Sequence, residues 1–246
     1  MKIAAYQAPL LAGGSMPAAV DLIARRVREC ETKDVSVLCC PEGVLGGLAD
    51  YSDNPSSLAI RRDELASILR PLFSPTLTSI VGFTELGPDG ALYNAAAIFQ
   101  RGTVIGVYRK IHPAIRRSVY TAGSETPVFR TGKLTFGIVI CYDSNFPELA
   151  KQMAGQGATA LFIPTNNGLP TDRASPRINS EATHVDARLA VDNGLWVIRA
   201  DVCGQNGKLV SFGSSEIVNP AGQVVMQASQ AGSKLLVADV GDPPDA

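Results

Sequence analysis

Histidine, tryptophan and cysteine are scarce in this chain of 246 residues, which contains two histidines, one tryptophan and five cysteines. Because imidazoles are few and no Cys-x-x-Cys pair occurs, the usual ligands of a zinc site are missing, and we expect no metal. A surplus of positive charge is missing too: 22 lysines and arginines face 23 aspartates and glutamates, for a formal net charge of −1. Neither nucleic acid nor an anionic membrane is therefore an expected partner.

Long apolar runs are also absent. No run approaches the roughly 20 residues of a membrane-spanning helix, so we expect no membrane segment. The first ten residues, MKIAAYQAPL, lack the apolar stretch of a secretory signal peptide. The five cysteines are odd in number and irregular in spacing. We therefore expect free thiols and a cytoplasmic protein.

Apolar residues nevertheless make up 46% of the chain, against 18% charged residues. A chain of this length buries about 70–75% of its unfolded surface, so it can form a core without cross-links. No linker, low-complexity segment or repeat divides it. We expect one domain over residues 1–246, with residues 241–246 as a loose tail.

Strand-like and helix-like segments alternate along the chain. Apolar runs bounded by turn residues predict strands, and apolar residues at helical spacing predict helices. The expected strands are residues 2–7, 35–40, 78–84, 92–100, 103–108, 136–140, 158–163, 195–200, 213–219, 224–227 and 234–240. The expected helices are residues 18–33, 58–69, 146–155 and 175–193. This order, with hairpins between strand–helix units, predicts an α/β sandwich with mixed sheets.

Three ionisable residues, Glu42, Lys110 and Cys141, each lie within two residues of the end of an apolar strand-like run. In layered α/β folds, ligands bind beyond the strand ends, where loops vary over a rigid base. Each residue alone has a structural alternative. A cysteine after a strand is commonly a small buried hydrophobe, and a glutamate or lysine in a turn is commonly solvated.

If the three side chains meet, they suit nucleophilic catalysis. A thiol reacts as a thiolate, so a nearby cation that lowers its pKa or a base that accepts its proton activates it. Lys110 would supply the positive charge and stabilise an oxyanion, and Glu42 would accept the thiol proton and later activate water. Cys141 also precedes a predicted helix, whose dipole and the backbone N–H of Tyr142 favour an oxyanion.

Residues 39–43 (CCPEG), 108–113 (YRKIHP) and 137–148 (GIVICYDSNFPE) resemble, in order, the three signature segments of the nitrilase, or carbon-nitrogen hydrolase, superfamily. Residues 2–7 and 191–197 resemble its opening strand and a later helix-to-strand junction. The resemblance implies a four-layer α-β-β-α sandwich, pairing into a homodimer or higher homo-oligomer, and no cofactor. It implies that Cys141 attacks an amide, carbamoyl or nitrile carbon and forms a thioester, with Glu42 as base and Lys110 as electrostatic partner.

The segment after Lys110 departs from the family pattern. Many members carry a second glutamate there, whereas this chain has Arg116 or its neighbours at that place. Arg116 either binds a carboxylate of the substrate, because guanidinium and carboxylate pair well, or points to solvent. Asn166 and Asn167, beyond another predicted strand, either line the pocket and bind an amide or form a turn. The two histidines are expected to be structural.

The leading functional prediction is hydrolysis of a small amide or N-carbamoyl compound. Nitrile hydrolysis in the same site is the nearest alternative. The missing glutamate leaves open a weakly catalytic or non-catalytic binding protein that retains the fold, although the intact Glu42, Lys110 and Cys141 oppose it. Acyl transfer to an amine is a further alternative.

Overall fold

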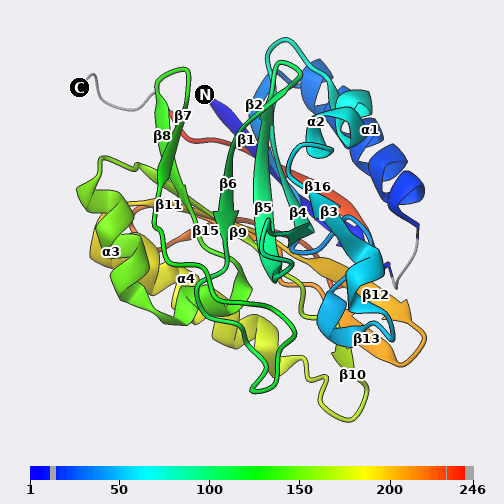
Figure 1. Cartoon of the computed structure of the whole chain (residues 1–246). Helices are drawn as coiled ribbons and strands as arrows, with labels where there is room; N and C mark the ends of the chain where they lie inside the picture. The colour runs from blue at the N-terminus through cyan, green and yellow to red at the C-terminus, as the bar shows by residue number, and fades with distance from the viewer. Residues whose placement is uncertain (12–14, 231, 242–246) are drawn as a thin grey trace.

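The computed structural model describes residues 1–11, 15–230 and 232–241. Two β-sheets pack face to face and helices cover their outer faces, which gives four layers in the order α-β-β-α (Figure 1). Helices α1 (Met16–Thr32) and α2 (Leu65–Ile68) cover one sheet, and α3 (Pro147–Gly155) and α4 (Arg177–Asn193) cover the other. The predicted fold class is confirmed.

The first sheet is mixed, with a parallel centre. Its strands run in the order β10 (Leu169–Pro170), β13 (Leu209–Phe212), β12 (Val202–Asn206), β1 (Lys2–Pro9), β2 (Val35–Cys39), β4 (Thr78–Leu86), β5 (Leu92–Gln100) and β6 (Thr103–Arg109), while β16 (Lys234–Asp239) pairs with β1 and β3 (Ala59–Arg61) pairs with β4. β1, β2 and β4 are parallel, and β4, β5 and β6 form an antiparallel meander.

The second sheet is mixed as well. Its strands run in the order β15 (Val224–Gln227), β14 (Glu216–Val218), β11 (Trp196–Ala200), β9 (Ala160–Pro164), β8 (Leu134–Ile138) and β7 (Val128–Thr131). β8, β9 and β11 are parallel, so their carboxyl ends meet at one edge, and antiparallel strands flank them. Short 3₁₀ helices η1 (Ala49–Tyr51), η2 (Pro55–Leu58), η3 (Arg70–Leu72) and η4 (Cys141–Asn145) lie in the connections.

Apolar side chains fill the space between the two sheets. Ile3 and Val37 of the first sheet and Phe136 and Phe162 of the second belong to one buried cluster. The Phe136 and Phe162 rings meet edge to face, with 5.2 Å between centroids. Full burial of each such side chain stabilises the fold by about 1.5–3 kcal/mol. This rigid double layer holds the strand ends in place.

A second cluster joins the first sheet to α1. The helix begins at Met16 with a proline in its first turn, where a missing N–H costs nothing. Val20, Ile23 and Val27 recur at spacings of three and four residues and are buried, as the periodicity predicts.

The prediction of a helix over residues 58–69 was wrong in its first half. Residues Ala59–Arg61 form β3, which pairs in parallel with the end of β4 and buries Ile60. The Arg61 N–H then donates to the Glu64 carboxylate at 3.1 Å, and only Leu65–Ile68 is helical. Tertiary pairing overrides helical spacing here. The strands β3, β7, β10, β12 and β13 were not expected.

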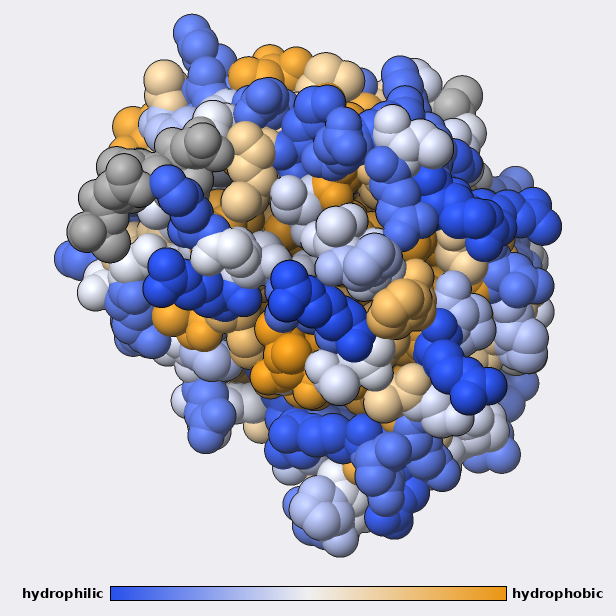
Figure 2. All heavy atoms as spheres, turned by 90° about the horizontal axis from the view of Figure 1, so that it is seen from above, coloured by the Kyte–Doolittle hydropathy of each residue, from blue (hydrophilic) through white to orange (hydrophobic). Residues whose placement is uncertain are grey.

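Hydrophilic side chains cover much of the face seen from above, with hydrophobic patches between them (Figure 2). In the described part of the chain, no helix is both long and apolar enough to cross a membrane. Most of the expected tail, residues 242–246, lies outside the described residues.

Candidate active site

Glu42 lies in a turn beyond β2 that contacts both sheets. The backbone N–H of Glu42 donates to the carbonyl of Thr165, which follows β9 in the other sheet, at 3.3 Å. β4 passes directly behind this turn at Gly82, where a Cβ would lie 2.8 Å from the Glu42 Cα. Glycine is therefore needed at position 82 to let the two backbones approach.

Lys110 lies at the end of β6 with its side chain buried. Its backbone N–H donates to the carbonyl of Asn94 in β5 at 2.8 Å, and its carbonyl accepts from Gly123 at 2.8 Å. The ammonium lies 2.6 Å from Oε1 of Glu42. The lysine and the glutamate are 4% and 2% exposed, so this is an ion pair removed from solvent.

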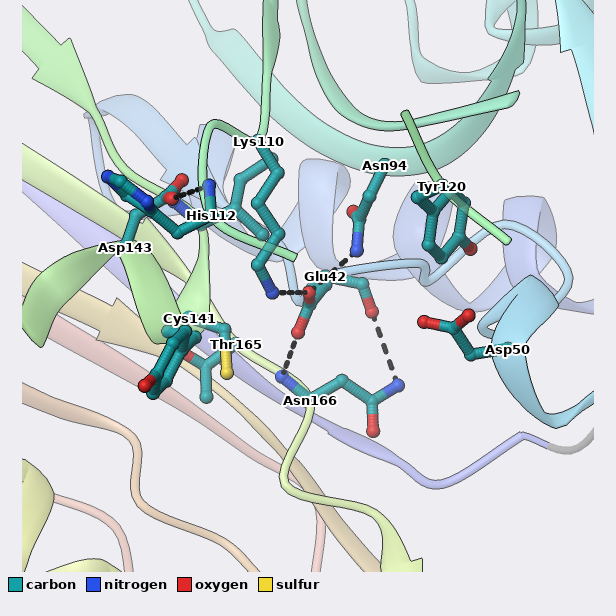
Figure 3. A network of polar contacts seen from close by, with 12 residues as sticks. Glu42, Asp50, Asn94, Lys110, His112, Tyr120, Cys141, Asp143, Thr165 and Asn166 are labelled. Atoms are coloured by element: carbon teal, nitrogen blue, oxygen red, sulfur yellow. Dashed lines mark hydrogen bonds and ion pairs between the residues drawn. The ribbon is translucent and has the colours of Figure 1, made fainter. Parts of the chain in front are cut away.

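Cys141 is the first residue of η4, just beyond β8 (Figure 3). Its φ angle is +48°, in the left-handed region that non-glycine residues rarely adopt. Such backbone strain concentrates at functional sites. Cys141 is partly exposed, whereas the other four cysteines are buried, and all five thiols are free.

The Glu42 carboxylate is held by three donors from three segments. Oε1 accepts from the Lys110 ammonium at 2.6 Å and from Nδ2 of Asn94 at 2.7 Å. Among the described residues, Oε2 accepts one hydrogen bond, from the backbone N–H of Asn166 at 3.0 Å (Figure 3). Oε2 therefore keeps a free lone pair, which makes it the better placed oxygen to receive a proton.

Asp143 ties the lysine segment to the cysteine segment. Its carboxylate accepts the backbone N–H of His112 at 2.7 Å, the hydroxyl of Tyr108 at 2.8 Å and the backbone N–H of Ile140 at 3.1 Å. Burial raises the pKa of Asp143, and Lys110 acts in the opposite direction. His112 itself stacks on Phe146 with 3.5 Å between ring centroids, which is the structural role expected of it.

The electrostatics of the site keep Cys141 protonated at rest. The pKa of its thiol is raised to about 12, because burial and the Glu42 carboxylate outweigh the opposite effect of Lys110 and Arg199. The sequence predicted that the Lys110 cation lowers this pKa. Lys110 does act in that direction, but the net pKa of the thiol is raised. Burial lowers the pKa of the Lys110 ammonium, but the charge of Glu42 raises it above its ordinary value overall.

A cavity of about 450 Å³ opens onto these residues. Its buried lining includes Glu42, Asn94 and Lys110, next to the partly exposed Cys141, and its exposed lining includes Arg116 and Arg173. Its size is in the range of small-molecule sites. Among the described residues, no cluster of three or more histidine, cysteine, aspartate or glutamate side chains is arranged to hold a metal.

The two asparagines of the expected substrate site line this cavity, but their amide donors bind the protein. Nδ2 of Asn166 donates to the Glu42 carbonyl at 3.3 Å. Nδ2 of Asn167 donates to Asp201 at 3.1 Å, and its Oδ1 lies 3.9 Å from the Cys141 sulfur. Both therefore position the base and the nucleophile, and substrate contact by either one stays a prediction.

Tyr142 and Arg116, also expected near the substrate, line the same cavity. Tyr142 is the second residue of η4, where backbone N–H groups have no partner within the helix. Tyr142 is 43% exposed. Arg116 is exposed at the mouth of the cavity.

Sequence reasoning missed Asn94, Asp143, Asp50 and Arg173. Asn94 had a signal, because it is a polar residue within the apolar run of β5. Asp143 also had a signal, because it is an acidic residue two positions after Cys141 in the same motif. Asp50 lines the cavity and accepts the Val119 N–H at 2.7 Å. Nothing in the sequence around Arg173 distinguishes it from a surface arginine.

Known proteins are similar to this chain in sequence and in fold. The family model described as carbon-nitrogen hydrolase matches residues 2–242. A hydrolase encoded in the pqqF 5′ region of Pseudomonas protegens is 28% identical over 246 residues, covering 93% of this chain and 79% of that protein. An N-carbamoylputrescine amidase of Oryza sativa subsp. japonica is 28% identical over 250 residues, covering 89% of this chain and 79% of that protein. Three further relatives are matched over shorter stretches, which span 53–66% of their lengths.

A solved structure adds a chemical observation about a similar protein. It is a mutant of the amidase from Nesterenkonia sp. AN1, with the acetamide moiety of fluoroacetamide added covalently at the active-site cysteine. It is 25% identical, with a TM-score of 0.79, covering 98% of this chain and 90% of that one. With the family model matching almost the whole length, this chain belongs to the carbon-nitrogen hydrolase family.

Proposed function

We propose that this protein is a cysteine-dependent amidase that cleaves a carbon–nitrogen bond in a small amide or N-carbamoyl compound. The observation that carries the proposal is the buried Glu42–Lys110 pair, 2.6 Å apart, in the same cavity as the Cys141 thiol. The pair supplies a base and a fixed cation beside a nucleophile. The rice and Nesterenkonia relatives, an N-carbamoyl amidase and an amidase with a modified cysteine, support this chemistry.

The first half of the reaction forms a thioester. As the Cys141 sulfur attacks the carbonyl carbon, its proton passes to Glu42, because a thiol with a pKa of about 12 has almost no thiolate at neutral pH. The Lys110 ammonium and the Tyr142 backbone N–H stabilise the negative charge on the carbonyl oxygen. The carbon–nitrogen bond then breaks, and the nitrogen leaves as ammonia or an amine with the proton from Glu42.

The second half hydrolyses the thioester. Water gives a proton to Glu42 as its oxygen attacks the thioester carbon. The carbon–sulfur bond breaks, and Glu42 returns the proton to the Cys141 sulfur. Overall, the amide and one water give an acid and ammonia or an amine, and Glu42 and the Cys141 thiol return to their starting states.

Asn94 orients the carboxylate of the proposed base. It is 4% exposed, and its Nδ2 donates to Oε1 of Glu42 at 2.7 Å. Its Oδ1 is buried and has no hydrogen-bond partner among the described residues, which costs about 1–3 kcal/mol. Asn94 is therefore held in place for the Glu42 carboxylate, which it helps to keep beside Lys110.

The test is a panel of small amides, N-carbamoyl compounds and nitriles, with released ammonia measured and the acyl-enzyme sought by intact-protein mass spectrometry. We expect turnover of an amide or carbamoyl compound that Cys141→Ala abolishes. Cys203→Ala, which removes a thiol outside the cavity lining, serves as the matched control. Turnover of nitriles alone would favour the nitrilase alternative. Undiminished amide hydrolysis by Cys141→Ala would refute the mechanism.

Assembly and location belong to the same proposal. We propose a homodimer or higher homo-oligomer, on the strength of the family resemblance, and a cytoplasmic location, on the strength of five free thiols. Light scattering during size-exclusion chromatography measures the first. Fractionation of cells expressing the protein at native level measures the second.

A further inference from the structure

Two arginines at the mouth of the active-site cavity come from segments far apart in the sequence. Arg116 lies in the connection between β6 and β7, and Arg173 lies in the turn after β10. Both line the same cavity as Cys141, and both are exposed. Among the described residues, neither guanidinium makes a hydrogen bond or an ion pair.

The carboxylates that share the cavity are already engaged. Asp50 accepts the Ser118 hydroxyl at 2.9 Å and the Val119 backbone N–H at 2.7 Å. Glu42 accepts from three donors, including the Lys110 ammonium. Lys110 is balanced by Glu42, so the two guanidiniums give the lining a net positive charge at its exposed end.

Apart from these charged groups and the two asparagines, the lining is mostly apolar or aromatic. It includes Leu48, Tyr51, Ile115, Tyr120, Tyr142 and Leu169. A ligand that matches this lining combines an amide for the buried Glu42 and Lys110, an apolar portion and an anionic group for the exposed arginines.

We infer that the substrate is a small amide or N-carbamoyl compound with a carboxylate at the end remote from the scissile bond, held by Arg116 and Arg173. The planar guanidinium fork matches a carboxylate in geometry and charge. Two such groups facing one cavity outweigh the isolated negative charge of Asp50. This inference rests on the proposed amidase function, because it places the carboxylate relative to the amide that Cys141 attacks.

The first experiment compares monoamides of straight-chain dicarboxylic acids with uncharged primary amides of equal chain length. Arg116→Ala, Arg173→Ala and the double variant are assayed beside Arg117→Ala, an exposed neighbour outside the cavity lining. We expect each single variant to lower kcat/KM on the acidic amides at least about tenfold, the loss of one charge-assisted contact, and the double variant to lower it further. The same variants should show no comparable change in kcat/KM on the uncharged amides, and Arg117→Ala should show none on either kind of amide. Equal losses on charged and uncharged amides, or none on charged ones, would overturn the inference.

The second experiment does not depend on turnover. Each straight-chain dicarboxylate that corresponds to a monoamide of the first experiment is added to Cys141→Ala protein, and its effect on the melting temperature is measured. We expect stabilisation that is absent when Arg116 and Arg173 are also replaced by alanine and that weakens with added salt. Dicarboxylate binding without amide hydrolysis would refute the amidase proposal and keep the anion site. Amide hydrolysis without dicarboxylate binding and without a preference for charged amides would keep the amidase proposal and refute the anion site.

Discussion

Glu216 is a buried carboxyl group whose ionisation the fold opposes. It is fully buried in β14, and its Oε2 accepts from Thr183 at 2.7 Å and from Gln227 at 3.1 Å. Its Oε1 has no hydrogen-bond partner among the described residues. Burial and the neighbouring Asp186 carboxylate raise the pKa of Glu216 to about 7. A proton on Glu216 lets it donate to Asp186, which gives the orphan oxygen a partner.

This pKa shift predicts a specific dependence of stability on pH. A carboxyl group whose pKa rises from 4.5 to about 7 on folding contributes stability below pH 4.5 and loses that contribution as the pH rises to about 7. The shift of about 2.5 units, at 1.36 kcal/mol per unit, corresponds to roughly 3 kcal/mol of unfolding free energy. Glu216→Gln keeps the shape and stays neutral, and its amide N–H can donate to Asp186 at every pH.

The assay is urea unfolding of the wild type and of Glu216→Gln at intervals from pH 4 to pH 8. We expect the two proteins to have similar stability near pH 4, and the variant to be more stable by roughly 3 kcal/mol near pH 8. Glu31→Gln, which changes an exposed carboxylate on α1, controls for net charge. If the difference between Glu216→Gln and wild type stays constant across this pH range, the carboxyl is not protonated in the native state and the reasoning fails.

Two other predictions concern the catalytic residues directly. In Gly82→Ala, the new methyl group overlaps the backbone at Glu42. We expect the free energy of unfolding, measured with urea, to fall by about 1–3 kcal/mol and kcat to fall as well. Gly155→Ala, whose Cβ meets no neighbour, is the control and should change neither quantity. Glu42→Gln removes a charge that raises the pKa of Cys141, so the pH profile of iodoacetamide alkylation should move to lower pH while hydrolysis is lost. An alkylation profile that stays in place or moves upward would contradict this electrostatic account.

The layers and the catalytic candidates were predictable because they depend on local pattern. The apolar runs over residues 136–140 and 158–163 predicted buried strands, and β8 and β9 overlap these ranges, so the polar residues that follow lie near a sheet edge. The motifs around Glu42, Lys110 and Cys141 then indicated which edge residues meet. Residues 59–61 were mispredicted because their pairing with β4 is a contact across the fold that helical spacing does not encode.

The groups that tune the site were harder to predict, because their roles depend on contacts between distant segments. Asp143 acts on the segment after β6, about 30 residues earlier, and Asn94 reaches a carboxylate 52 positions away. Arg173 has a proposed role only because it lines the same cavity as Arg116, and no spacing in the sequence links the two. The net pKa of Cys141 is a balance of burial and opposing charges, so its sign requires the packed structure.

The same balance explains why a buried base and a buried cation are both needed. Lys110 lowers the pKa of the Cys141 thiol, whereas burial, the larger effect, and the Glu42 carboxylate raise it, so the proton stays on sulfur. A neutral thiol is less reactive towards alkylating and oxidising agents than a thiolate, although Cys141 itself is partly exposed. In the mechanism proposed above, Oε2 of Glu42 takes the proton when a carbonyl carbon arrives, and the Lys110 ammonium, which faces the carboxylate at rest, stabilises the new oxyanion. In that mechanism the Glu42–Lys110 pair, 2.6 Å apart, withholds the reactivity of the thiol until a substrate is bound.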